Sequence, residues 1–296
     1  MAIETKNIAL DGLTYTLDDR DRVAAQVALQ HSNAGAHFKY AAGSGFGPTD
    51  LVVGKGGSDD NTADPFTQSS TQLFPLGTKL MYGERTYRYA FSGEANNAGV
   101  LLEGAALVNA NHRDIAVQAA STGTSLAVTL GATATTANQY AEGYAHLNDD
   151  TADVNSQGKL FKIKTHAAAD AAATATFTLY DTIDVSIPTT GKVDLILNPY
   201  KDVVKCATSP VNTALGVTPI EIADDRYFWL QTGGPASVLI ADAVAVLGQP
   251  VVRNVGTAGS ARGIDSDSDT LNGIIGTTMV VNGAGDQAVI WLNLDW

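Results

Sequence analysis

Residues 73–108, LFPLGTKLMYGERTYRYAFSGEANNAGVLLEGAALV, carry the clearest fold signal in this chain of 296 residues. A Gly-Glu pair at 83–84 separates two apolar runs, which is the pattern of a β-hairpin with a short turn. In the second run, Tyr87, Tyr89 and Phe91 recur with a period of two, so we expect them to form one buried face. The stretch therefore predicts antiparallel β structure.

The arginines of the second run, Arg85 and Arg88, are expected to be solvated or to face acidic partners. Short runs rich in Val, Ile, Thr, Tyr and Phe recur to the end of the chain between turn residues, and helical stripes are few. In residues 174–179, Thr alternates with Ala, Phe and Leu. Residues 227–250 suggest three strands, with a turn at Gly233-Gly234. We predict a mostly β protein of antiparallel β-sandwich or barrel-like lobes with an extended N-terminal arm.

Three regions follow from these patterns: an N-terminal arm and irregular segment (1–72), a central β-domain (73–205) and a C-terminal β-domain (206–296). Residues 23–30 fit a helix and a strand equally well by periodicity. Residues 41–72 are rich in Gly, Asp and Asn. They indicate either a disordered linker or an arm that becomes ordered on a partner.

Composition bounds the function. The net charge of −13 opposes binding to nucleic acid and to anionic membranes. The single cysteine, Cys206, allows no intramolecular disulfide and no CxxC metal site. No signal peptide and no membrane-spanning run of ~20 apolar residues is evident, so we expect folding in a cytoplasm. Charged residues are only 17% of the chain. This indicates either a surface covered by partners or a surface of Thr, Ser, Asn and Gly.

No motif in the sequence indicates catalysis, cofactor binding or a metal site. Alternate carboxylates at Asp265, Asp267 and Asp269 resemble the start of an EF-hand loop, but the glycine and the final glutamate of that loop are missing. The histidines show no zinc-site spacing and are expected to be ordinary polar or interface residues: His31, His37, His112, His146 and His166. No nucleophile elbow or phosphate loop is present. We therefore expect no catalytic residue, no cofactor and no metal ligand.

The tryptophans also raise the possibility of carbohydrate binding, because an indole ring can stack on a sugar ring. Trp229 and Trp291 fall inside predicted strands, so we expect them in the core rather than on a sugar. The terminal Trp296 is expected in a strand that packs into a sheet or a neighbour.

The pattern FPLGT-(apolar)-G-(E/D)-R-(T/V)-(Y/F)-R-Y, met here from Phe74 to Tyr89, resembles a family of structural proteins encoded with the head genes of tailed bacteriophages, marine ones especially. A looser match covers residues 224–252, where (D/E)-x-Y-x-W-(L/V)-Q-x-G-G begins at Asp225. The resemblance implies a virion protein, assembled in the host cytoplasm, that decorates and stabilises the assembled capsid. Its partners would be the major capsid protein and further copies of itself, a trimer being one option.

Two rivals stay open: the major capsid protein itself, and a receptor-binding fibre or lectin-like tip. A glycan-active enzyme ranks below both. It stays open because glycosidase chemistry needs only two carboxylates, whose spatial pairing a sequence cannot show. The expectation is a protein without enzymatic activity.

Overall fold

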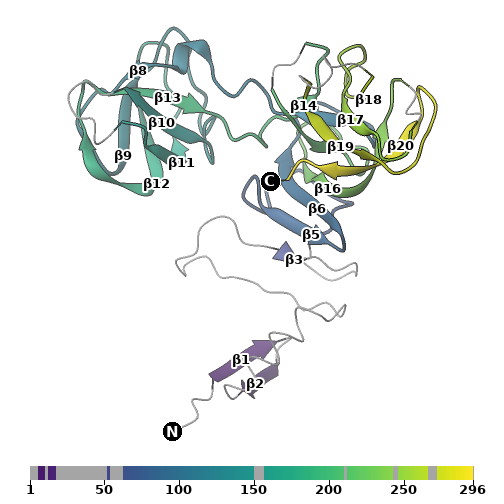
Figure 1. Ribbon diagram of the computed structural model, residues 1–296. Coiled ribbons are helices and arrows are strands. Elements are labelled where there is room, and N and C mark those ends of the chain that lie inside the picture. Colours follow the sequence, from purple (N-terminus) through teal and green to yellow (C-terminus); the bar gives the residue numbers. More distant parts are fainter. Residues whose placement is uncertain are drawn as a thin grey trace.

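The computed structural model (Figure 1) is built almost entirely of antiparallel strands, which confirms the predicted fold class. It describes residues 6–10, 13–17, 52–53, 63–149, 157–209, 212–242, 246–265 and 272–295. Near the N-terminus, β1 (Lys6–Leu10) pairs with β2 (Leu13–Leu17) as a hairpin. Most of the predicted arm, including residues 23–30, lies outside the described residues.

Six strands form a curled sheet, here called the small barrel, in the order β8-β13-β10-β11-β12-β9. These are β8 (Ile115–Ala116), β9 (Ser121–Thr129), β10 (Tyr144–Asp149), β11 (Leu160–His166), β12 (Thr174–Ile187) and β13 (Lys192–Ile196). A bridge between Val117 and Val128 joins the two ends of the sheet. The predicted alternation in β12 is confirmed: Ala175, Phe177 and Leu179 point into the core while the intervening threonines are exposed.

Twelve described strands form the second sheet, here called the large lobe. They are β3 (Val52–Val53), β4 (Gln68–Ser69), β5 (Lys79–Tyr82), β6 (Arg85–Phe91), β7 (Leu101–Glu103), β14 (Val204–Lys205), β15 (Ala214–Val217), β16 (Tyr227–Leu239), β17 (Pro250–Arg253), β18 (Ala261–Gly263), β19 (Ile274–Thr278) and β20 (Gln287–Asn293). The sheet curls until its ends meet, because Gly259 N donates to Cys206 O and Gly259 O accepts from Leu101 N.

The small barrel is an insertion in the large lobe. β7 pairs with β14, although residues 104–203, and with them the whole small barrel, lie between the two strands. Strands on both sides of position 205, where the sequence suggested a boundary, thus belong to one sheet. Figure 1 shows strands β8–β13 gathered apart from β14 and β16–β20.

Polar contacts fasten the two parts together. The Glu142 carboxylate, in the small barrel, accepts hydrogen bonds from Leu76 N at 2.6 Å and from Gln72 Nε2 at 3.0 Å. The Asn198 amide donates to the Glu142 carbonyl, and Lys201 Nζ donates to the carbonyls of residues 138 and 139. Burial of Lys201 in this contact lowers the pKa of its ammonium group.

β16 is a single long strand, which corrects the predicted turn at Gly233-Gly234. Its first half pairs with β6 and its second half with β20, and the register shifts between Gln231 and Gly233. The pair is therefore a β-bulge, which bends a strand without ending it. Gly234 has φ +76°, and a Cβ there would lie 2.4 Å from the Glu84 carbonyl oxygen, so only glycine fits.

The predicted hairpin is present as β5 and β6, joined by the turn at 83–84. Tyr87 and Tyr89 are buried, and Phe91 is partly buried against the same cluster, which confirms the expected face. The Tyr89 ring lies 5.0 Å from Trp229 and 5.8 Å from Tyr227, centroid to centroid.

On the opposite face of β6, Arg88 donates to Asp295 Oδ1, with Nε 2.7 Å and Nη2 2.6 Å away. Lys79 Nζ contacts the other oxygen of the same carboxylate. The hairpin is thereby tied to the C-terminal end of the chain, as expected for an arginine that faces an acidic group.

Candidate functional site

The histidines His112 and His166 belong to a buried network around Tyr140. His112 Nε2 lies 2.8 Å from Thr133 O, so it must donate, and Nδ1 accepts from the Tyr140 hydroxyl at 2.6 Å. His166 Nε2 accepts from Tyr140 N, and Nδ1 donates to Ala167 O. All four ring nitrogens are occupied, so these residues brace the small barrel and have no lone pair left for a metal.

Burial also sets the titration of this network. It lowers the pKa of His166 and raises the pKa of Tyr140 to about 12. His146 makes only a long, 3.4 Å contact with Asp194, while His31 and His37 lie outside the described residues.

Cys206 and the buried charged residues of the large lobe have structural roles in its core. Burial raises the pKa of the Cys206 thiol to about 12, which leaves it protonated and poorly nucleophilic. Arg253 and Glu103 form a fully buried ion pair with Nη1 and Oε2 3.0 Å apart. Arg253 also donates to Asn212 O and Ala207 O, so the pair anchors the chain that follows β14.

The acidic stretch at 265–269 is only partly described. Asp265 forms an ion pair with Arg262 at 2.6 Å, and Asp267 and Asp269 lie outside the described residues. Among the residues that the structure describes, no three His, Cys, Asp or Glu side chains gather closely enough to share a metal ion. Within that same part, no helix has the length and apolar character needed to cross a membrane.

The three tryptophans do not share one environment. Trp229 is buried in the aromatic cluster as predicted. Trp291 is not in the core: it is 44% exposed on the outer face of β20, because its neighbours Ile290 and Leu292 take the inward positions. Trp296 lies outside the described residues.

Trp291 is part of an exposed apolar surface, here called the β19–β20 face. Its members are Val246, Leu247, Met279, Val280, Val281 and Trp291, all exposed. Hydrogen bonds bring the segments together: Gly248 N donates to Thr278 O, and Met279 N and Val280 N both donate to Val289 O. Clustered exposed apolar side chains of this kind mark interaction surfaces more often than single ones do.

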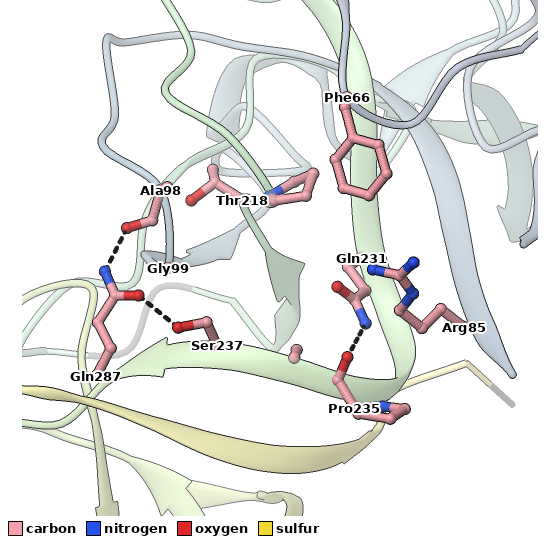
Figure 2. Close-up of a pocket in the computed structure, with 11 residues that line it drawn as sticks. Phe66, Arg85, Ala98, Gly99, Thr218, Gln231, Pro235, Ser237 and Gln287 are labelled. Carbon is pink, nitrogen blue, oxygen red and sulfur yellow. Dashed lines mark hydrogen bonds between the residues drawn. The ribbon is translucent and has the colours of Figure 1, made fainter. Parts of the chain in front are cut away.

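Figure 2 shows a pocket of about 150 Å³. One residue of its lining, Pro235, is paired with Trp291 across β16 and β20. Its wall is formed by β16 and its bulge, the start of β20, Phe66, Arg85 and the loops at 98–99 and 218–219. Gln231 Nε2 donates to Gly233 O and Pro235 O, which fixes the amide within the wall. Gln287 donates to Ala98 O and accepts from the Ser237 hydroxyl.

No family model, curated protein or solved structure matches this chain. The site must therefore be judged on its own geometry. The β19–β20 face and the pocket are the two features that sequence reasoning missed. The pocket gathers residues from distant segments and left no local signal. The face did leave one, because Ala288, Ile290 and Leu292 alternate and would place Trp291 opposite them.

Proposed function

We propose that this protein is a structural component of a tailed-phage virion, bound to the assembled capsid as a decoration protein, with no enzymatic role. The single observation that carries the proposal is the β19–β20 face. The resemblance of the β5–β6 hairpin to phage head proteins supports the choice of partner, the major capsid protein.

The face has the chemistry of a protein contact. It includes a tryptophan, Trp291, a residue type that is enriched among the residues that dominate binding energy at protein interfaces. The surrounding Met, Val and Leu side chains add apolar area to be removed from water. Asp286, directly before β20, is exposed, and the chain as a whole carries −13. Charge complementarity therefore favours a shell surface with a basic rim over an acidic one.

Mass action supplies the mechanism. A protein that binds only the assembled shell stabilises it by RT ln(1 + [L]/Kd) for each site occupied. Modest stabilisation at each site, repeated over a whole shell, would oppose disassembly. The Glu142 contacts between the small barrel and the large lobe would let both parts act as one unit.

The test uses purified shells that lack this protein. Wild-type protein should bind at a copy number in the hundreds per particle, measured by gel densitometry and cryo-electron microscopy. Leu247→Asp and Val280→Asp place a charge in the β19–β20 face and should reduce occupancy at least tenfold. Leu160→Asp is the matched control, because Leu160 is also exposed, at 54%, but lies on β11 of the small barrel.

Failure of wild-type protein to occupy shells would overturn the proposal. Equal losses for Leu160→Asp and the two face variants would show that the face is not the contact.

One observation favours a second candidate. An exposed indole such as Trp291 can stack on a sugar ring, as in a lectin-like tip. That role predicts only a handful of copies per virion, so the same densitometry separates the two functions.

A further inference from the structure

The Arg85 guanidinium has no ion-pair partner within the part of the chain that the structure describes. Its Cζ lies 5.4 Å from the centre of the Phe66 ring and 5.3 Å from that of Tyr82, so it contacts two aromatic rings. Among the described residues, no carboxylate lies within ion-pair distance and no acceptor takes a hydrogen bond from it. Arg88, three positions along, is by contrast bound to Asp295.

The guanidinium faces the pocket. In Figure 2 it points toward Gln231 beneath the Phe66 ring. Gln231 uses both its amide hydrogen bonds on the bulge, which leaves its Oε1 without a partner in the described part of the chain. The pocket thus offers a planar cationic donor, an unpaired acceptor and an aromatic surface.

These three features define a ligand. A planar guanidinium binds a carboxylate through two parallel N–H···O bonds. Oε1 of Gln231 can accept a hydrogen bond from an N–H or O–H group close to that carboxylate. The volume of about 150 Å³ equals roughly five liquid water molecules, enough for one acidic side chain but too little for a nucleotide.

We propose that this pocket binds the side-chain carboxylate of an Asp or Glu residue in a partner polypeptide. The carboxylate pairs with Arg85, and an N–H of the same polypeptide donates to Gln231 Oε1. The capsid shell as the source of that residue rests on the proposed function. The affinity of the pocket for a carboxylate is independent of the proposed function.

The probe is a capped glutamate, N-acetyl-glutamate methylamide, titrated into the full-length protein. The arginine Nε–H signals are followed by proton–nitrogen NMR. Saturable shifts with affinity in the millimolar range are expected for a contact this small. The isosteric capped glutamine should bind roughly tenfold or more weakly, because it loses a charge-assisted hydrogen bond.

Two variants locate the binding. Arg85→Met removes the charge and should abolish the shifts, and Arg85→Lys, which keeps the charge but not the planar fork, should weaken binding. Arg113→Met is the matched control, since Arg113 is exposed and belongs to the small barrel. Equal binding of capped glutamine, or unchanged binding by Arg85→Met, would overturn the proposal. So would the absence of saturable shifts with capped glutamate.

Shell binding then tests the source. If wild-type protein occupies shells and Arg85→Met occupies them less, the shell supplies the acidic residue. Equal occupancy by the two proteins would overturn the shell as the source. Failure of the wild type to bind shells counts against the proposed function, and the peptide titration still decides the chemistry of the pocket.

Discussion

Tyr87 and Tyr89 form a matched pair that tests how the aromatic cluster stabilises the large lobe. Both are buried on the same face of β6, but their hydroxyl groups differ. Tyr89 Oη accepts a hydrogen bond from Leu73 N at 3.1 Å. The Tyr87 hydroxyl is buried and has no hydrogen-bond partner in the described part of the chain. Changing either residue to Phe removes one oxygen atom and keeps the ring.

The two changes should therefore have opposite signs. A buried hydroxyl without a partner costs about 1–3 kcal/mol of desolvation. Tyr87→Phe should remove that cost, and we expect the free energy of unfolding to rise by up to about 1 kcal/mol after the loss of packing around the oxygen. Tyr89→Phe loses a satisfied hydrogen bond and should lower the free energy of unfolding by about 0.5–1.5 kcal/mol. Urea titration at neutral pH measures both.

The pH dependence gives a second readout. Burial raises the pKa of Tyr87 to about 12 from its ordinary 10. A folded-state pKa above the unfolded one means that the contribution to stability is complete below pH 10 and is lost as pH rises toward 12. A shift of this size corresponds to about 3 kcal/mol, to order of magnitude. Tyr87→Phe should flatten the fall in stability between pH 10 and 12.

A single result would refute this reasoning. If Tyr87→Phe lowers the free energy of unfolding as much as Tyr89→Phe does, the Tyr87 hydroxyl must have a partner in solution. An unchanged fall in stability between pH 10 and 12 in the same variant would lead to the same conclusion.

The truncation Tyr89→Ala, which removes the whole ring, should lower the free energy of unfolding by about 3–5 kcal/mol. This loss measures how much the aromatic cluster contributes to stability.

Two further experiments test the large lobe by urea unfolding. Gly234→Ala should cost about 3 kcal/mol from its positive φ and the contact with the Glu84 carbonyl, whereas Gly83→Ala, with φ +62° and open space around it, should cost only about 1 kcal/mol. Similar losses at both glycines would argue against the bulge. Glu103→Gln leaves the Arg253 guanidinium buried without its carboxylate and should cost about 3–5 kcal/mol, much of which the added change Arg253→Met should recover. No recovery in the double variant would show that the ion pair itself, rather than an unpaired charge, governs stability.

The sequence predicted what local patterns determine. The β5–β6 hairpin follows from a two-residue turn between alternating residues, and β12 follows from its period of two. Both signals lie within about fourteen residues. The turn predicted at Gly233-Gly234 was wrong because a bulge and a turn need the same residue type, a glycine with positive φ. Only the pairing of β16 with two different strands distinguishes them.

The insertion of the small barrel between β7 and β14 could not be predicted from the sequence, for a different reason. β7 and β14 meet across the whole small barrel, and each contributes two or three residues to the ladder. The sequence of a strand this short does not specify which strand it pairs with. The pairing is determined by how the strand packs in the completed sheet. The pocket has the same origin, because Phe66, Arg85 and Gln287 come together only once β16 has paired with both β6 and β20.

The register of β16 and β20 places the two proposed contacts side by side. Pro235, which lines the Arg85 pocket, lies directly opposite Trp291, and opposed residues of an antiparallel pair share one face. One partner segment could then lay apolar side chains on Trp291 and place an acidic residue on Arg85. The net charge of −13 would repel an acidic segment at long range, whereas the unpaired guanidinium would attract it at contact. Such a surface would select its partner by the spacing between apolar and acidic residues rather than by overall charge, because only a segment with that spacing makes both contacts at once.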